Sequence, residues 1–132
     1  MKKLFVLILA FAGIGKIQAQ EYFTIKDYDV HIKVNKDASL DISENINVHF
    51  SEPRHGIIRK IPYKYQVQPL PANAQKTDRQ LESGGYTRTI VENINVPGWN
   101  FDVSNEGDYK SIKIGSADKF VEGDQQFIIT YR

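Results

Sequence analysis

The sequence contains no cysteine among its 132 residues, so it can form neither a disulfide framework nor a lipid-modified N-terminal cysteine. It also lacks an excess of positive charge: 17 lysines and arginines stand against 16 acidic residues, with no basic stripe suited to a nucleic-acid backbone. No stretch has a convincing helical period, and no group of residues forms a catalytic, cofactor or metal signature. These absences favour a protein that is not an enzyme, does not bind nucleic acid and depends on an ordinary apolar core.

The N-terminal residues have the layout of a secretory signal peptide. Lys2 and Lys3 form a positive start, residues 4–14 are largely apolar, and Ala19 offers a small residue before a cleavage site. The apolar run is too short for an ordinary membrane span, although an uncleaved anchor is the alternative. We therefore expect residues 1–19 to be removed on export. The single β domain that remains, residues 20–132, has 14 basic and 16 acidic residues.

Two neighbouring segments alternate between apolar and polar residues, as half-buried β-strands do. They cover residues 28–34 and residues 40–50, and the polar connection between them is typical of a hairpin turn. Facing residues of an antiparallel pair share one side of the sheet. Matching the two apolar faces therefore places Val34 opposite Leu40, and the rest of the register follows.

The second of these strands carries one charged residue, Glu44, where the alternation requires an apolar one. In the predicted register Glu44 lies on the inner face, opposite Val30. A lone buried carboxylate is strongly unfavourable, so Glu44 requires a partner. Arg59 is the natural candidate, because a guanidinium can bind a carboxylate through two parallel hydrogen bonds.

The rest of the chain contains shorter segments of β-forming residues separated by turn signals. Pro62 interrupts residues 57–67, which predicts an edge strand or a bent strand, and residues 69–85 predict a long exposed loop. Further strands are expected over residues 86–96, 99–103, 109–114 and 125–131, with turns at 97–98, 105–108 and 122–124. This spacing favours an all-β fold, a two-sheet antiparallel β-sandwich of immunoglobulin-like architecture with about seven strands.

Several motifs occur in a distinctive order: a Leu-x-Ile-x-Glu strand ending at Glu44, HGIIRKIP over residues 55–62, IKIG over residues 112–115 and a final QQFIITY strand. In this order the chain resembles the N-terminal exported domain of the YciQ-like predicted membrane proteins, a family built around a domain of unknown function. The resemblance covers essentially all of the chain from Tyr22 onward. It implies an extracytoplasmic β domain, tethered by transmembrane helices that we expect beyond Arg132; the alternative is a soluble short form of the family.

The HGIIRKIP motif suggests a structural role for the unusual carboxylate. Gly56 permits a tight backbone turn, and Arg59 follows it on the same segment. We interpret Glu44 and Arg59 as a clasp that pins this segment across the first hairpin. The competing interpretation makes Glu44, His55, Gly56 and Arg59 a ligand site.

Histidines offer little support for a metal site or a hydrolase. In the predicted register His31 faces Ser43 and His49 faces Ile25, which separates the two rings by roughly 20 Å at the usual strand rise. They cannot share a metal at that distance. A triad of Ser43, His31 and Asp29 would lie on an open sheet face without an oxyanion hole, so hydrolytic activity is not expected.

Aromatic residues offer one alternative site. Tyr63, Tyr65 and Trp99 would suit a platform for a sugar or a peptide, because tyrosine and tryptophan combine apolar area with a polar group. The alternative is that Trp99 fills the core after the turn at residues 97–98.

Two function classes remain. The first is a non-enzymatic interaction or structural module on the extracytoplasmic face of the cytoplasmic membrane, in the periplasm or at the cell surface. Its partner would be a protein or another envelope component. The second is a binding module for envelope glycans or peptides that uses residues 69–85 and the nearby aromatic residues. The sequence identifies neither the partner nor the oligomeric state.

Overall fold

The computed structural model describes residues 22–66 and 85–132, and their regular structure consists of eight β-strands. The strands are β1 (Phe23–Val34), β2 (Leu40–Arg54), β3 (Gly56–Pro62), β4 (Lys64–Gln66), β5 (Tyr86–Arg88), β6 (Phe101–Glu106), β7 (Tyr109–Gly115) and β8 (Val121–Tyr131). The expected signal peptide, and all but the last residue of the expected loop at residues 69–85, lie outside the described residues. In the described part of the chain, no helix is long and apolar enough to cross a bilayer.

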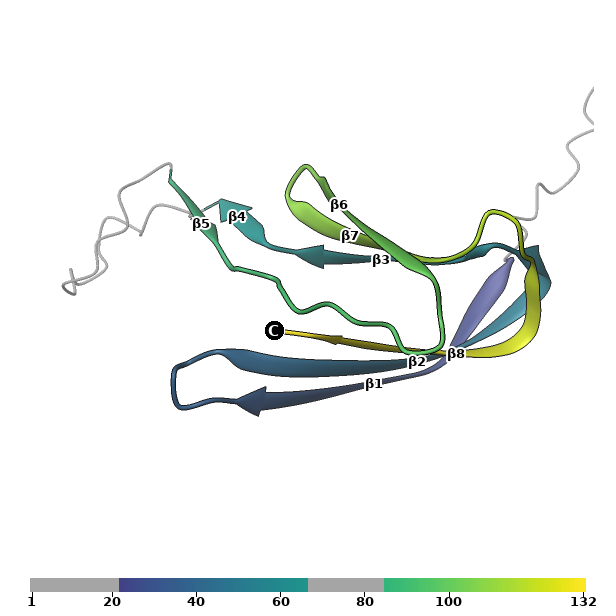
Figure 1. The fold of residues 1–132 in the computed structure, drawn as a ribbon, viewed down its shortest axis with the longest axis horizontal. Helices are drawn as coiled ribbons and strands as arrows, with labels where there is room; N and C mark the ends of the chain where they lie inside the picture. The colour runs from purple at the N-terminus through teal and green to yellow at the C-terminus, as the bar shows by residue number, and fades with distance from the viewer. Residues whose placement is uncertain (1–21, 67–84) are drawn as a thin grey trace, which may run out of the picture.

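Two three-stranded antiparallel sheets pack face to face, and a short ribbon of β4 and β5 extends from one end (Figure 1). The strand orders are β1-β2-β8 and β3-β7-β6. The predicted β-sandwich is therefore confirmed, with one strand more than expected. Pro62 ends β3, which is an edge strand as predicted. The buried core between the sheets consists of Ile46, Val48, Phe50, Ile61, Val96, Ile112, Ile114, Phe127 and Ile129.

The first hairpin has the predicted register over most of its length. Val34 pairs with Leu40, and Val30 pairs with Glu44. A bulge between Ile25 and Asp27 then shifts the pairing by one residue. Because of this shift His49 faces Thr24, so its predicted pairing with Ile25 is wrong.

Two further expectations about strands are corrected by backbone pairing. Residues 122–124 are not a turn but part of β8, where Gly123 has a φ of 66° and pairs with Phe50. Of the strand expected over residues 86–96, only β5 and one isolated bridge at Asn95 are present. The rest of that segment runs along β8 instead, with backbone hydrogen bonds between Asn95 and Thr130 and between residues 92 and 132.

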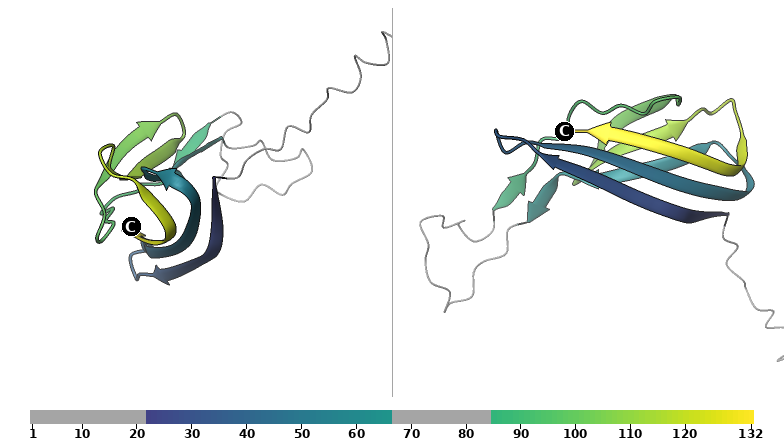
Figure 2. Two further views of the ribbon diagram at one scale, coloured as in Figure 1. Left: turned by 90° about the vertical axis from the view of Figure 1, so that its right-hand side faces the viewer. Right: turned by 90° about the horizontal axis from the view of Figure 1, so that it is seen from below.

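β1 lies at the edge of its sheet and is exposed along its whole length, although its sequence alternates like that of a half-buried strand (Figure 2). Its apolar side chains share a face with the buried residues of β2, since Tyr28 pairs with Ile46. They nevertheless remain 43–72% exposed from Tyr28 to Val34. The expectation of half-burial is wrong for β1, because the sheet β3-β7-β6 covers β2 and β8 but leaves this strand open.

Candidate functional site

Glu44 is 1% exposed, and its carboxylate is held by two neighbours. Arg59 donates from Nε to Oε2 at 2.6 Å and from Nη2 to Oε1 at 2.7 Å. The hydroxyl of Tyr131 donates to Oε1 at 2.7 Å. The structure thus brings Glu44 and Arg59 together in the two-pronged contact inferred from the sequence, and adds Tyr131 as a third member.

These three residues come from three strands and both sheets. On β2 and β8, Glu44 pairs with Ile129 and Tyr131 pairs with Ile42, so both polar side chains face the interior. Arg59 shares the inward face of β3 with the buried Ile61, and it reaches across from the opposite sheet. The cluster Glu44–Arg59–Tyr131, which we call the clasp, therefore ties the two sheets together near one end.

The electrostatics of the clasp keep it charged at neutral pH. Burial acts to raise the pKa of Glu44, but the hydrogen bonds from Arg59 and Tyr131 outweigh it, and the pKa lies below its usual value. The hydrogen bond to Glu44 raises the pKa of Arg59, and burial together with Glu44 raises the pKa of Tyr131. Both oxygens of the Glu44 carboxylate are thus engaged by neighbouring side chains.

Tyr28 of β1 borders the clasp. Its ring centre lies 6.0 Å from the Arg59 guanidinium carbon. Burial and the nearby Glu44 carboxylate raise the pKa of Tyr28. Sequence reasoning missed both tyrosines, although Tyr131 ends the QQFIITY motif and Tyr28 belongs to the first apolar alternation.

A pair of glycines positions β3, the strand that carries Arg59. Gly56 begins β3 and pairs with Gly115, the last residue of β7, and their φ angles are 126° and 129°. A Cβ atom on Gly56 would clash with the carbonyl oxygen of Ile114, and one on Gly115 would clash with that of His55. The two motifs HGIIRKIP and IKIG therefore meet at a point where only glycine fits.

His55 lies apart from the clasp. Its Nδ1 is 3.1 Å from the carbonyl oxygens of both Ser116 and Lys119, and its ring stacks on Phe120 at 4.2 Å. Because a carbonyl oxygen can only accept, Nδ1 carries the proton in this contact. These contacts take His55 to the β7–β8 connection, so the structure does not assemble it with Glu44 and Arg59 into one ligand site.

The three candidate aromatic residues also lie in different surroundings. Trp99 is half-buried: its ring packs on Phe127 at 4.5 Å, and its Nε1 donates to the carbonyl oxygen of Gln126 at 3.0 Å. Tyr65 is exposed and donates to the carbonyl oxygen of Pro62. Tyr63 lies beside Lys110. Among the described residues no contact joins the three into one platform, and Trp99 packs against the core without being fully buried in it.

A cleft of about 660 Å³ opens between the first hairpin turn and residues 89–92. Its apolar walls include Leu40, Ile61 and Ile90, and the polar groups that reach it include Arg59 and Tyr65. The cleft is lined by two members of the clasp, Arg59 and Tyr131, and by one of the candidate aromatic residues, Tyr65.

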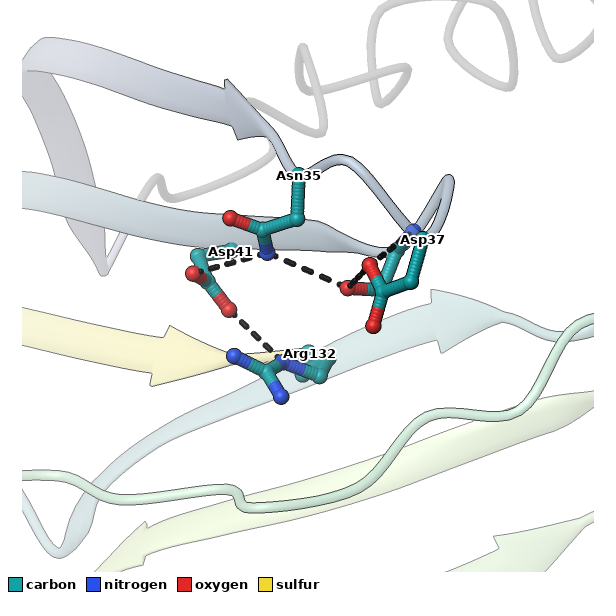
Figure 3. Close-up of polar contacts among 5 residues, drawn as sticks. Asn35, Asp37, Asp41 and Arg132 are labelled. Atoms are coloured by element: carbon teal, nitrogen blue, oxygen red, sulfur yellow. Dashed lines mark hydrogen bonds and ion pairs between the residues drawn. The ribbon is translucent and has the colours of Figure 1, made fainter.

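A second polar network borders this cleft through Asp37, Ser39 and Arg132. Figure 3 shows its side chains. Asn35 donates to Asp41 at 2.9 Å, and Arg132 donates to the other oxygen of Asp41 at 2.7 Å. The hydrogen bonds from Arg132 and Asn35 lower the pKa of Asp41. Asp37 accepts from the hydroxyl of Ser39 within the turn, which lowers its pKa as well. The network fixes the shape of the hairpin turn and joins it to the end of β8.

His31 and His49 lie on the outer face of the sheet β1-β2-β8. His31 faces Ser43, as predicted, and His49 lies 2.6 Å from Asp124, which also binds Lys26. In residues 22–66 and 85–132, no group of three or more histidine or acidic side chains is arranged to hold a metal ion.

Comparison with known proteins gives one match. A family model described as the N-terminal domain of a predicted membrane protein (DUF2207) covers residues 24–132. The resemblance inferred from the motifs is thereby confirmed. No curated protein and no solved structure matches the chain.

Proposed function

This chain belongs to the DUF2207 family of predicted membrane proteins, and we propose that it acts as a non-enzymatic interaction module on the extracytoplasmic face of the cytoplasmic membrane. The observation that carries the proposal is the open apolar face of β1, whose apolar side chains from Tyr28 to Val34 are 43–72% exposed. A contiguous exposed apolar surface is typical of a site that another molecule covers.

The location is part of the proposal. A positive start, an apolar run and a small residue at Ala19 support export, and the family is one of predicted membrane proteins. Helices beyond Arg132 would then tether the domain, with a protein or another envelope component as its partner.

The clasp supports a structural role for Glu44. Glu44 is buried, and it accepts three charge-assisted hydrogen bonds from Arg59 and Tyr131. Both oxygens of this carboxylate are occupied by bonds within the fold, which favours a structural role for Glu44. The exposed chemistry of the domain is instead apolar surface and strand edge, which suit binding.

Site-specific photocrosslinking in cells that make the whole protein tests the proposal. A benzophenone amino acid replaces Tyr28 or Ile32 on β1 or, as a matched control, Tyr109 on the other sheet; Tyr28 and Tyr109 are 43% and 46% exposed. We expect protein adducts from the two β1 positions and none from the control. Absence of any adduct from both β1 positions would overturn the proposal.

The cleft beside Arg59 favours a second candidate, a binding module for envelope glycans or peptides. Tyr65 is 45% exposed at this cleft and can stack on a sugar ring. A glycan array probed with the wild type, Tyr65→Ala and the control Tyr109→Ala separates the candidates. Reproducible sugar binding that only Tyr65→Ala abolishes would favour this second function.

A further inference from the structure

The two edges of the sheet β1-β2-β8 differ in how their backbone groups are used. Beside β8, Asn95 exchanges hydrogen bonds with Thr130, and Glu92 exchanges them with Arg132, so the C-terminal end of this edge is already covered. Among the described residues, β1 pairs with β2 alone. The β8 edge is thus partly covered by residues 92–95, whereas the β1 edge is open, and an open edge is a template for another strand.

The free backbone groups of the open edge can be assigned. Asn35 donates its N–H to the carbonyl oxygen of Ser39 in the hairpin turn. This bond determines which alternate residues of β1 direct their backbone groups toward β2. Because backbone groups alternate in direction along a strand, the N–H and C=O groups of Tyr28, Val30 and Ile32 point away from β2. The residues with free backbone groups are the same ones that carry the exposed apolar side chains.

The charged side chains of β1 are asymmetric along the strand. Lys26, in the bulge, binds Asp124; after it Asp27 and Asp29 come first, and the basic residues His31 and Lys33 follow, all four on the outer face of the sheet. An antiparallel copy of the same strand, reversed about Val30, would present the opposite order of charge. Asp27 would then face the partner's Lys33, and Asp29 would face the partner's His31.

We propose that the strand that pairs with this open edge is β1 of a second copy of this chain, which runs antiparallel about a twofold axis at Val30. The proposal rests on the proposed function and names its partner. In this register Val30 faces the partner's Val30 and Tyr28 faces the partner's Ile32, so residues with free backbone groups stand opposite each other as an antiparallel ladder requires. The two sheets then join into one continuous sheet of six strands, and the interface is isologous.

Neighbouring registers are less favourable. An axis at Asp29 places two carboxylates opposite each other, and an axis at His31 places two imidazoles opposite each other. The bulge before Asp27 and the turn after Val34 limit the regular segment, and Val30 lies close to its middle. Charge and strand length thus select the axis at Val30, and the backbone phase is compatible with it.

Sedimentation of the purified protein over a range of concentrations tests the register. We expect the wild type to shift from monomer to dimer as its concentration rises. Asp27→Lys or Lys33→Asp alone would place like charges opposite each other twice and weaken the dimer roughly tenfold. The double variant Asp27→Lys with Lys33→Asp restores the opposite charges and should recover wild-type association, which no effect on a single chain would produce.

Two further variants complete the test. Val30→Pro removes the N–H that points to the open edge and should abolish the dimer while leaving the β1–β2 hydrogen bonds intact. Asp102→Lys makes the same charge change as Asp27→Lys on β6 of the other sheet and should leave association unchanged. A wild type that stays monomeric at every concentration, or a double variant that does not recover, overturns the proposal. If Ile32 then forms crosslinks to a different protein, the proposed interaction module stands and only the proposed dimer fails. If neither β1 position forms crosslinks, both proposals fail.

Discussion

Val30 and Glu44 are cross-strand partners, yet the apolar residue is 46% exposed and the charged one is 1% exposed. The difference arises from what lies above each residue. Glu44 lies on the central strand of its sheet, beneath Arg59 of β3, whereas Val30 lies on the edge strand that the second sheet does not reach. Alternation along a strand thus determines which face a residue occupies, and the opposite layer determines whether that face is buried.

The largest effect is expected in the clasp. Arg59→Met would leave the Glu44 carboxylate buried without its main partner, and we expect it to lower the free energy of unfolding by about 3–5 kcal/mol. The measurement is urea unfolding followed by the fluorescence of Trp99, the sole tryptophan.

Lys60→Met is the matched control, because Lys60 is the next residue of β3 and forms an exposed ion pair with Glu106. It should cost less than about 1 kcal/mol. Equal stability of Arg59→Met and the wild type would show that the clasp does not hold the sheets together.

A second prediction concerns the strand that delivers Arg59. Gly56→Ala would place a Cβ against the Ile114 carbonyl at a φ of 126°, and we expect a loss of about 2–4 kcal/mol. Gly98→Ala is the matched control: its φ of 81° is also positive, but no atom lies within 4 Å of the added Cβ. Thermal melts of both variants should rank Gly56→Ala well below Gly98→Ala, and the reverse order would contradict the close approach of β3 and β7.

The sequence predicted the clasp because its two main members carry separate local signals. Glu44 interrupts an alternation whose register follows from the adjacent hairpin, and Arg59 lies in a nearby motif of the same chain segment. Tyr131 could not be found in this way, since the pairing of β2 with β8 joins residues 87 positions apart. The bulge before Asp27 was also missed, because no glycine or proline marks it.

The openness of β1 could not be predicted for a different reason. Its apolar residues repeat every second position, as those of a covered strand do. Coverage depends on the width and position of the opposing sheet, whose strands β3, β6 and β7 all follow the first hairpin in the chain. The sequence of residues 28–34 does not indicate where the opposing sheet lies.

Tyr131 should link the clasp to pH. Tyr131→Phe removes a hydrogen bond to a charged group and should cost about 1.5–3 kcal/mol at pH 7. The pKa of folded Glu44 lies below its ordinary value of 4.5, so the stability that its charge contributes is present above that value and is lost as the pH falls. The difference between Tyr131→Phe and the wild type should therefore shrink between pH 6 and about pH 3 in urea unfolding experiments. If the difference in unfolding free energy stays constant over this range, the contribution of Tyr131 does not depend on the charge of Glu44.

The smallest effects compare one substitution in both regions. Val48 on β2 is 2% exposed and Val34 on β1 is 72% exposed, so replacing each by threonine tests burial with nearly constant shape. Val48→Thr would bury a hydroxyl and should cost about 1–3 kcal/mol, whereas Val34→Thr should change the unfolding free energy by less than about 0.5 kcal/mol. The free energy of unfolding should be measured at low protein concentration, so that unfolding starts from the monomer. A large cost for Val34→Thr under those conditions would mean that β1 is covered within a single chain, and the open strand would then be unavailable to any partner.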